Sequence, residues 1–408
     1  MVTSINTEQI TEYDDAAKSR KDWQIVRFEQ MAECITDRVD DPSEANVEYY
    51  VGLEHLDSES LKISRWGKPG DVEATKLRFK PGDIIFGKRR AYQRKVAVAE
   101  FEGICSAHAM VLRAREDVVL KDFLPFFMQS DTFFERALSI SVGSLSPTIN
   151  WKTLAQQEFA LPPKDEQRRI ADILWATDEM YKTRENLLNS VLTTRRLSID
   201  QIFSNLSSSS VSTHATILKD VSKMQNGRSF PSEEYCEKGV RLLRPGNLGK
   251  NGYFYWNDDN IKYLPIEYLD TAQEYLINSG DVVINLTAQS LEEGFMGRVC
   301  LARENDASLL NQRIGRFICQ NRILPEYLYR CLQTSSFRTL VETNCEGSKI
   351  KHLYWHHIEN FPIQLPSRQK QQYLIKVLDA VDNTFADTEK NLKDANLFRR
   401  SLREKLLS

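Results

Sequence analysis

Apolar residues recur at seven-residue spacing in two long stretches of the chain. The stretch after Pro366 keeps two mostly apolar seam positions for nearly five heptads, and the stretch after Pro163 is similar but less regular. Neither stretch contains Pro or Gly. This pattern predicts two helices of about 40 residues, roughly 60 Å long, with coiled-coil seams. The seam of the second stretch consists of Leu374, Val381, Thr388, Ala395 and Leu402, and of Leu378, Phe385, Leu392, Arg399 and Leu406.

An amphipathic helix of this length needs a partner for its apolar seam. We expect each long helix to pair with the other; the alternative is that each packs on its own domain. Arg195 and Arg399 occupy the same seam position in the two helices. A charge in a seam costs stability, so we expect these arginines either to pair with acids across the seam or to mark a splayed point.

The two helices belong to an internal duplication. The repeated residues keep a constant offset of 204 (347 − 143 = 204 and 400 − 196 = 204), without a gap, through the shared back of each unit. A duplicated chain makes a pseudo-twofold object, which suits a twofold partner such as duplex DNA. The repeated residues are Gly143, Ser144, Trp151, Leu161, Pro162, Gln167, Leu174, Ala176, Asp178, Leu188, Arg195 and Arg196, and then Gly347, Ser348, Trp355, Leu365, Pro366, Gln371, Leu378, Ala380, Asp382, Leu392, Arg399 and Arg400.

The front part of each unit is strand-rich and variable. The Gly-Asp segments at 77–86 and 275–284 correspond at an offset of 198 (281 − 83), and before them the halves barely match. A variable front would recognise a target specific to its own unit, whereas a shared back would dock on a partner that both units have in common. Short apolar runs at 84–86, 96–99, 109–112, 282–284 and 315–318 predict strands, and the patterns at 123–138 and 325–341 predict amphipathic helices.

The expected organisation is α+β, with two domains and two spacer helices. A serine-rich segment, 204–213, predicts a flexible linker between the units. The boundaries are 1–160 for domain 1, 161–203 for the central helix, 204–213 for the linker, 214–364 for domain 2, and 365–408 for the C-terminal helix.

Composition excludes several classes of protein. With 408 residues, 41% hydrophobic and 10% aromatic, the chain suits two folded domains and not a disordered protein. No apolar run reaches the length of a membrane span, and the first 20 residues are polar and acidic. The seven cysteines have no Cys-x-x-Cys spacing, which indicates reduced thiols in a cytoplasmic protein. The net charge of −3 is a weak argument against binding of nucleic acid, because the distribution of charge matters more than the total.

The strongest cluster of charge is the segment 88–95, Lys-Arg-Arg-Ala-Tyr-Gln-Arg-Lys, with five cations and no acid. It lies between two predicted strands, so it is a loop, where lysine and arginine can contact phosphates and arginine can read guanine. The alternative is a basic loop that is merely solvated. The corresponding segment of the second unit, 286–293, has no cation, so the two units would read different bases.

Catalytic motifs are missing from the sequence. There is no phosphate-binding Gly-x-x-x-x-Gly-Lys loop, no Gly-x-Gly-x-x-Gly dinucleotide loop, and no Asn/Asp-Pro-Pro-aromatic element of an amino-methyltransferase. His352 and His356 are four residues apart, with His357 and Cys345 nearby, which is one possible zinc arrangement. We expect no metal there, because the counterpart of His356 in the first unit is Lys152 and the segment follows a Gly-Ser turn.

The chain resembles the specificity (S) subunit of type I restriction–modification systems. The similarity lies in the Gly-Ser…Asn150-Trp151 block, the Leu-Pro-Pro-x-x-Glu-Gln-x-x-Ile run at 161–170, its echo at 365–374, and the long helix after each. The segment 82–90 and Ser106-Ala-His108 also resemble a first target-recognition domain.

The resemblance implies two tandem target-recognition domains that each read half of a split DNA site, and two helices that pair as an antiparallel coiled coil. It also implies a subunit without catalysis or cofactor, two methyltransferase (M) subunits docked on the repeated regions, and restriction (R) subunits as optional further partners. The expected DNA contacts are Lys88, Arg89, Arg90, Tyr92, Gln93, Arg94, Lys95, His108, Ser144, Arg228, Arg244, Asn247, Thr287, Gln289, Ser290, Gln312, Arg313, Ser348 and Lys349.

Two other functions stay open at this point: a DNA-recognition adapter of another defence or modification complex, and a protein scaffold that does not bind DNA. A neighbouring adenine-methyltransferase gene would favour the specificity subunit over the adapter. DNA binding in the presence of the methyltransferase would exclude the scaffold.

Overall fold

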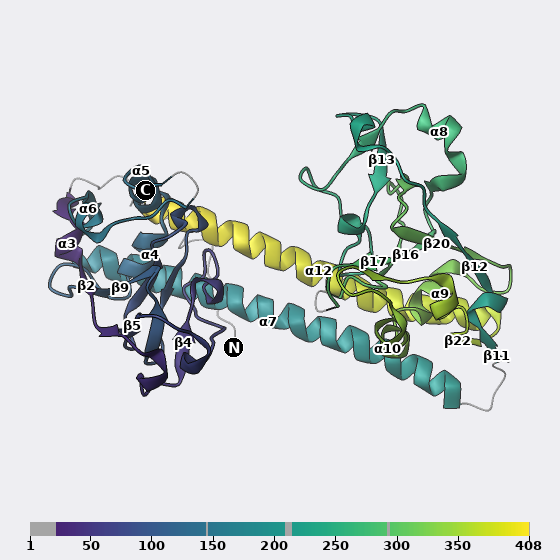
Figure 1. Cartoon of the computed structure of the whole chain (residues 1–408), viewed down its shortest axis with the longest axis horizontal. Coiled ribbons are helices and arrows are strands. Elements are labelled where there is room, and N and C mark those ends of the chain that lie inside the picture. Colours follow the sequence, from purple (N-terminus) through teal and green to yellow (C-terminus); the bar gives the residue numbers. More distant parts are fainter. Residues whose placement is uncertain (1–21, 144–145, 209–213, 292–293, 408) are drawn as a thin grey trace. The chain divides into compact units, whose positions relative to one another are not determined.

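The computed structural model describes residues 22–143, 146–208, 214–291 and 294–407. The chain forms two compact units (Figure 1). Unit 1 consists of Met1–Glu185 together with Asn391–Ser408, and unit 2 is the continuous stretch Asn186–Lys390. Each unit therefore contains one strand-rich domain and a part of each long helix. No helix in the described part of the chain is long and apolar enough to cross a membrane.

Unit 1 has two four-stranded sheets and a small pair of strands. The sheet orders are β2-β9-β6-β7 and β3-β5-β8-β4, and β1 pairs with β10. The elements are β1 (Gln24–Arg27), α3 (Phe28–Met31), β2 (Ala32–Ile35), β3 (Arg38–Val39), β4 (Tyr49–Val51), β5 (Lys76–Phe79), β6 (Ile84–Gly87), β7 (Val96–Val98), β8 (Gly103–Ser106), β9 (Ala109–Ala114), α4 (Leu124–Gln129), α5 (Asp131–Ser139), α6 (Trp151–Ala155) and β10 (Glu158–Leu161).

Unit 2 repeats this plan. Its sheet orders are β12-β20-β16-β18 and β14-β13-β19-β15, and β11 pairs with β22 and β17 with β21. The elements are β11 (His214–Ile217), β12 (Ser222–Asn226), β13 (Val240–Leu243), β14 (Tyr263–Leu264), α8 (Tyr268–Thr271), β15 (Leu276–Ile277), β16 (Val282–Asn285), β17 (Thr287–Ala288), β18 (Val299–Leu301), β19 (Ser308–Leu310), β20 (Ile314–Cys319), α9 (Pro325–Cys331), α10 (Ser335–Asn344), β21 (Lys351–His352), α11 (Trp355–Ile358) and β22 (Pro362–Leu365).

The duplication of the backbone reaches further than the similarity of the sequence. In unit 1, β8 pairs parallel with β4 and antiparallel with β5, and in unit 2, β19 pairs parallel with β13 and antiparallel with β15. Only the fourth strand differs, because β3 extends this sheet beyond β5 whereas β14 extends it beyond β13. The variable fronts of the two units therefore share one frame.

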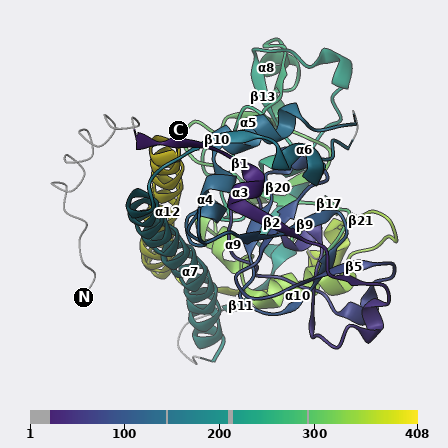
Figure 2. The same cartoon turned by 90° about the vertical axis from the view of Figure 1, so that its left-hand side faces the viewer.

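The long helices are α7 (Lys164–Ser208) and α12 (Arg368–Leu407). Within each unit the two helix segments lie side by side and run antiparallel (Figures 1 and 2). The two seam arginines do pair with acids of the other helix. Arg399 bonds Asp178 at 2.7 Å in unit 1, and Arg195 bonds Asp382 at 2.6 Å in unit 2. The expected antiparallel pairing of the helices is thus confirmed.

The linker expected at 204–213 begins too early. α7 continues to Ser208, because Phe203 and Leu206 still pack against the core of unit 2. The hydroxyls of Ser207 and Ser208 donate to the carbonyls of Phe203 and Ser204, so these serines remain compatible with a helix. Residues 209–213 lie outside the described part of the chain.

The strands expected from apolar runs are present, but the two expected domain helices are each split. α5 begins after Ser130, whose hydroxyl accepts the N–H of Phe133, and α10 begins after Thr334, whose hydroxyl accepts the N–H of Phe337. These positions correspond at the same offset of 204 (334 − 130). A side-chain cap inside a helical pattern therefore starts a new helix in each unit.

A repeated glutamine fixes each long helix to its domain. The buried Gln167 accepts the N–H of Leu120 at 2.8 Å and donates to the carbonyl of Pro162 at 2.9 Å. Gln371 does the same with Leu324 at 2.9 Å and Pro366 at 3.1 Å. Each amide satisfies backbone groups that would otherwise be buried without partners, which explains why both repeats carry glutamine at this position.

The two units differ in the side chains that join a domain helix, α4 or α9, to the long helix beside the seam. In unit 1 the rings of Phe126 and Trp175 meet edge to face with centroids 4.8 Å apart. The corresponding residues of unit 2 (126 + 204 and 175 + 204) are Arg330 and Asp379, which form an ion pair at 2.7 Å. Arg330 is buried and also bonds Asp382 at 2.8 Å. An aromatic pair and an ion pair thus occupy equivalent places.

Asp382 is the centre of this ionic cluster. Burial opposes its ionisation, but the hydrogen bond and charge of Arg195, the charge of Arg330, and the hydroxyl of Tyr253 outweigh burial and hold its pKa below the ordinary value. Its counterpart Asp178 pairs in the seam with one arginine among the described residues, Arg399.

We predict that Asp382→Ala destabilises unit 2 by about 3–5 kcal/mol, because it removes the carboxylate that pairs with Arg195 and leaves the buried guanidinium of Arg330 with Asp379 alone. Asp178→Ala should destabilise unit 1 by less. The contribution of Asp382 should be complete above the ordinary carboxyl range near pH 4 and disappear as the pH falls through the lowered folded pKa. Hydrogen exchange of α9 against α4, measured in both variants between about pH 3 and 7, tests this; equal destabilisation of the two units would contradict it.

Candidate nucleic-acid interface

Three loops meet at one end of the sheets in unit 1. Loop A is 88–95, loop B is 106–108, and loop C is the described residues 142–143 and 146–149. Backbone hydrogen bonds join them: the N–H of Ile149 donates to Lys88 at 2.9 Å, that of Arg90 to Pro147 at 2.8 Å, and that of Arg89 to His108 at 3.3 Å. The sheet strands that enter and leave these loops thus hold the cations of loop A beside His108.

The cations of loop A divide into two groups. Arg94 pairs with Asp131 and lies over the ring of Phe134, 4.8 Å from its centroid, and Lys95 donates to the carbonyl of Leu53 at 2.6 Å. These two side chains anchor the loop to the domain. Of the other three cations, Arg89 and Arg90 are exposed and Lys88 is half-buried; the ring of Tyr92 is exposed as well.

The conformation of loop A presents the exposed group. Arg90 and Arg94 both have left-handed backbone, with φ of 55° and 53°, on either side of a 3₁₀ turn whose Ala91 is buried. The small buried alanine pins the loop while its neighbours point outward. Loops A and B together line a pocket of about 360 Å³, bordered by Leu53, Glu54, Arg89, Arg90, Gln93, Lys95, Ser106 and His108.

Unit 2 has the same three loops with other residues. Here loop A is 286–291, loop B is 311–313, and loop C is 346–353. The N–H of Leu286 donates to Arg313, and the N–H of Leu353 donates to Leu286, both at 2.9 Å. β17 in loop A and β21 in loop C pair directly, Thr287 with His352 (Figure 2). These contacts join the three loops, which carry the sequence-predicted residues Thr287, Gln289, Ser290, Gln312, Arg313, Ser348 and Lys349.

Arg228 joins this group from β12's end. Its carbonyl accepts the N–H of Gln312 at 3.0 Å, and its guanidinium lies 5.5 Å from the ring centroid of Phe230. Unit 2 lacks cations on the described part of loop A, and it carries Arg313 on loop B and Lys349 on loop C instead. The two units therefore carry their positive charge on different loops of the same three-loop arrangement.

Two expected contact residues of unit 2 have structural contacts. Asn247 is completely buried; its Oδ1 accepts the N–H of Arg244 at 2.9 Å and its Nδ2 donates to Asn260 at 3.3 Å. Arg244 is half-buried and donates to the carbonyl of Asn260 at 2.9 Å. Asn247 thus shapes the turn after β13. Ser144 lies outside the described residues.

Sequence reasoning missed the correspondence between the two B loops. The sheet registers align His108 with Arg313 at an offset of 205, because Leu112 and Phe317 occupy the same place opposite β6 and β16. The signal was present: a Ser or Asn before a two-residue turn, followed by an apolar strand. The correspondence was not recognised because its offset of 205 differs from the offsets of 204 and 198 found elsewhere in the repeat.

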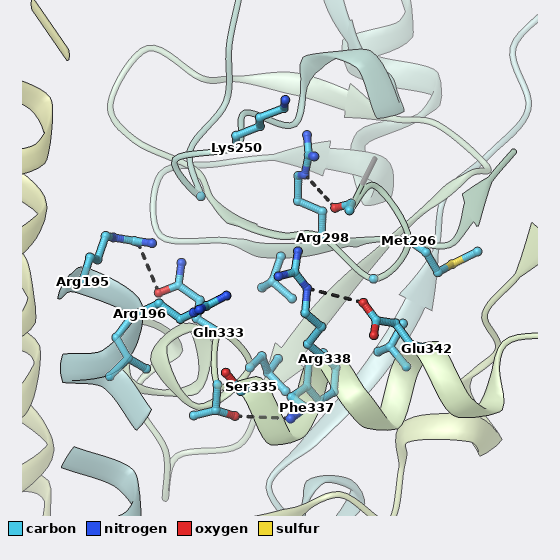
Figure 3. A pocket seen from close by; sticks show the side chains of 18 of the residues that line it. Arg195, Arg196, Lys250, Met296, Arg298, Gln333, Ser335, Phe337, Arg338 and Glu342 are labelled. Carbon is cyan, nitrogen blue, oxygen red and sulfur yellow. Dashed lines mark hydrogen bonds and ion pairs between the residues drawn. The ribbon is translucent and has the colours of Figure 1, made fainter. Parts of the chain in front are cut away.

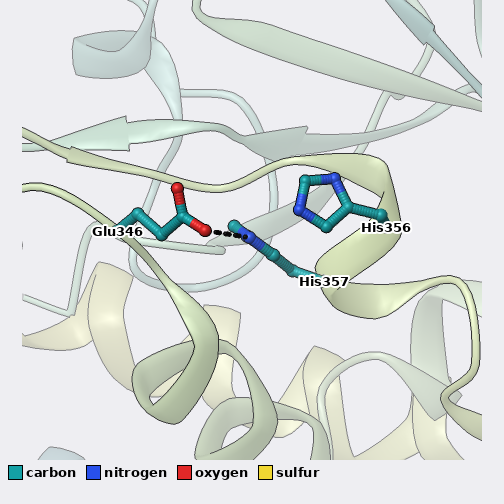
Figure 4. Close-up of side chains that lie close together, drawn as sticks. All are labelled: Glu346, His356 and His357. Atoms are coloured by element: carbon teal, nitrogen blue, oxygen red, sulfur yellow. Dashed lines mark hydrogen bonds and ion pairs between the residues drawn. The ribbon is translucent and has the colours of Figure 1, made fainter.

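The histidines near loop C of unit 2 form a compact group with a glutamate. Ligand atoms of Glu346, His356 and His357 lie within 4.8 Å of one another (Figure 4). His357 accepts the N–H of Tyr354 through Nδ1 at 3.2 Å, and its Nε2 faces Glu346 Oε1 at 3.1 Å. A neutral ring then carries its proton on Nε2 and has both nitrogens occupied. The contacts therefore give His357 a capping role at the start of α11.

A larger pocket of about 610 Å³ lies between α7, α10 and the loop before β18 in unit 2 (Figure 3). Arg196, Lys250 and Arg338 line it above an apolar floor that includes Phe337. Arg338 pairs with Glu342 at 3.6 Å, whereas its counterpart in unit 1, Phe134, packs under Arg94. Leu291 and Gly294 line the pocket on either side of residues outside the described part of the chain, and we assign no ligand to it.

Comparison with known proteins identifies relatives along nearly the whole chain. The family described as type I restriction modification DNA specificity domain matches residues 20–193 and again 216–395. The MjaVIII specificity subunit of Methanocaldococcus jannaschii is 22% identical over 341 residues, which cover 80% of this chain and 76% of the relative. The EcoDI specificity subunit of Escherichia coli is 29% identical over 175 residues, 41% of this chain and 38% of the relative.

Solved structures share the fold. A chain of a type I restriction–modification system, reported for its assembly and conformational transition, has a TM-score of 0.61 at 17% identity, covering 94% of this chain and 97% of that one. The S subunit from M. genitalium has a TM-score of 0.52 at 17% identity, covering 95% and 96%. The chain belongs to the family of type I restriction modification DNA specificity domains, of which it contains two copies in tandem.

Proposed function

We propose that this chain is the DNA-specificity subunit of a type I restriction–modification complex. The observation that carries the proposal is the three-loop frame, present twice with different exposed side chains. One frame with two sets of side chains suits a bipartite DNA site in which each unit reads its own half. The names of the relatives, specificity subunits of type I restriction enzymes, support the same reading.

The charge of the loops suits a DNA backbone although the whole chain is slightly acidic. Exposed lysines and arginines beside neutral hydrogen-bonding groups can position the protein on phosphates and read base edges. The residues that we propose to contact DNA are Lys88, Arg89, Arg90, Tyr92, Gln93 and His108 in unit 1, and Arg228, Thr287, Gln289, Ser290, Gln312, Arg313, Ser348 and Lys349 in unit 2. Arg94 and Lys95 serve to hold loop A.

The chain would supply specificity and not catalysis. It lacks the sequence motifs for ATP or S-adenosylmethionine chemistry, so two M subunits would provide methylation and R subunits would provide cleavage. The repeated backs of the units would be the docking places for the M subunits, because the same partner must bind twice. Action on cellular DNA would place the complex in the cytoplasm.

Methylation mapping tests this function directly. The chain, assembled with its M subunits, should methylate one bipartite sequence, and the isolated chain should show no saturable binding of S-adenosylmethionine. Saturable S-adenosylmethionine binding by the isolated chain would overturn the non-catalytic role. Methylation at sites with no shared sequence would overturn the role in specificity.

The exposed cations of loop A should contact phosphates or bases. We predict that Arg89→Ala with Arg90→Ala weakens DNA binding by the assembled enzyme and lowers the slope of log K against log salt by about 0.9 for each phosphate that is no longer neutralised. The matched control is Lys80→Ala with Lys121→Ala, which removes two exposed cations beyond the far ends of β6 and β9. Filter binding at several salt concentrations measures both effects; identical affinities and identical slopes in the two variants would mean that loop A is merely solvated.

The paired helices should act as the spacer between the half-sites. We predict that one heptad inserted after Glu185 and another after Lys390, which add about 10 Å to each helix, change the gap between the half-sites and preserve their bases. Each unit keeps its own aspartate–arginine pair in this variant. Seven residues inserted between Ser208 and His214 are the control. Altered half-sites with an unchanged gap, seen by methylation mapping, would refute the spacer.

A further inference from the structure

Loop B has the same backbone in both units and different side chains. In unit 1 it is Ser106-Ala107-His108 between β8 and β9, and in unit 2 it is Asn311-Gln312-Arg313 between β19 and β20. Each turn joins the two sheets of its unit. The side-chain oxygen of Ser106 accepts the N–H of His108 at 3.2 Å, and that of Asn311 accepts the N–H of Arg313, also at 3.2 Å. The last residue of each turn is thus held in an equivalent position.

In unit 2 this position carries a guanidinium group. Arg313 is exposed, and its carbonyl is fixed by the N–H of Leu286 from loop A. Within the described part of the chain, its guanidinium has no hydrogen bond or ion pair. Its backbone is held while its donors are available to a ligand. The described residues of loop A, 286–291, offer no cation of their own.

In unit 1 the same position carries His108, and the guanidinium comes from loop A. Nη1 of Arg89 lies 3.0 Å from Nε2 of His108. A guanidinium can only donate, so Nε2 accepts and the neutral ring carries its proton on Nδ1. Partial burial and the charges of Arg89, Lys88 and Lys76 lower the pKa of His108, which agrees with a neutral ring. His108 therefore holds Arg89 against loop B.

We infer that the guanidinium at loop B determines one base of each half-site: Arg313 reads guanine in unit 2, and Arg89, positioned by His108, reads guanine in unit 1. This inference rests on the proposed function and adds the residues that set specificity. Two N–H donors of arginine match O6 and N7 of guanine in the major groove, and other bases do not offer that pair of acceptors. Each half-site should therefore contain a G·C pair that depends on loop B.

The test for unit 2 is selection from DNA with randomised half-sites by the assembled methyltransferase. Arg313→Ala should reduce the preference for guanine at one position of one half-site by roughly 5- to 150-fold, which corresponds to about 1–3 kcal/mol at 1.4 kcal/mol per tenfold. All other positions should keep their preferences. Lys238→Ala, at the opposite end of β13 from loop B, is the matched control and should change no position.

A uniform loss of affinity in Arg313→Ala, with a lower salt slope and unchanged base preferences, would mean that Arg313 contacts a phosphate, and it would overturn the inference. The proposed function would survive that outcome, because the enzyme would still select a bipartite sequence. If the unaltered enzyme selects no sequence at all, the proposed function itself fails.

The test for unit 1 separates positioning from charge. His108→Ala should reduce guanine preference at one position of the other half-site by several-fold or more and leave the salt slope unchanged, because Arg89 keeps its charge. His108→Gln, whose amide oxygen can again accept from Arg89, should restore part of the preference. Arg89→Ala should abolish the same preference. Adding His108→Gln to Arg89→Ala should not restore it, because no guanidinium remains at this place. A reduced preference at different positions in the two single variants would overturn the role of His108.

Discussion

A buried aspartate–arginine pair between the two long helices sets their register, and it occurs once in each unit. Asp178 with Arg399 and Asp382 with Arg195 are the same pair at an offset of 204. A slip of one residue would leave these charges buried and unpaired, at a cost of about 3–5 kcal/mol for each broken pair. Apolar heptads alone allow several registers, so the ionic pairs select one.

The register has a direct effect on the domains, because each domain is tied to its helix by a buried amide. Gln167 and Gln371 satisfy backbone groups of the loops before α4 and α9, and the helix therefore cannot rotate without breaking those bonds. The aspartate–arginine pair and the glutamine act along one rigid element. Together they hold each three-loop frame in a defined orientation on its own helix pair.

The units show how far a duplicated core can diverge without losing its shape. Phe126 against Trp175 and Arg330 against Asp379 fill equivalent places with dispersion in one case and charge in the other. Burial of the Arg330 guanidinium costs desolvation that an aromatic pair does not, and Asp379 together with the cluster around Asp382 offsets that cost with additional bonds. Unit 2 therefore depends on ionisation at a place where unit 1 does not.

Local patterns predicted much of this structure, and non-local pairing accounts for most of what they missed. Heptads and the constant offset predicted the helices; for Arg195 and Arg399 the sequence left pairing with acids and a splayed seam as alternatives, and the structure shows the pairing. The pairing of strands in the front sheets could not be predicted, because the strands of the two units correspond at offsets of 198 and 205 and pair across long stretches of chain. Burial of Asn247 and the capping role of His357 depend on partners such as Asn260 and Glu346, which composition does not reveal.

The division of the chain also imposes an order on its folding during synthesis. Unit 2 is one continuous stretch, whereas unit 1 needs residues 391–408, and Leu402, Leu406 and Leu407 pack in its core. The N-terminal domain emerges first from the ribosome, yet it can complete its core only after Leu402, Leu406 and Leu407 have been made. Unit 2 can therefore complete its core before unit 1 does. A truncation that removes Leu402, Leu406 and Leu407 would damage the N-terminal domain.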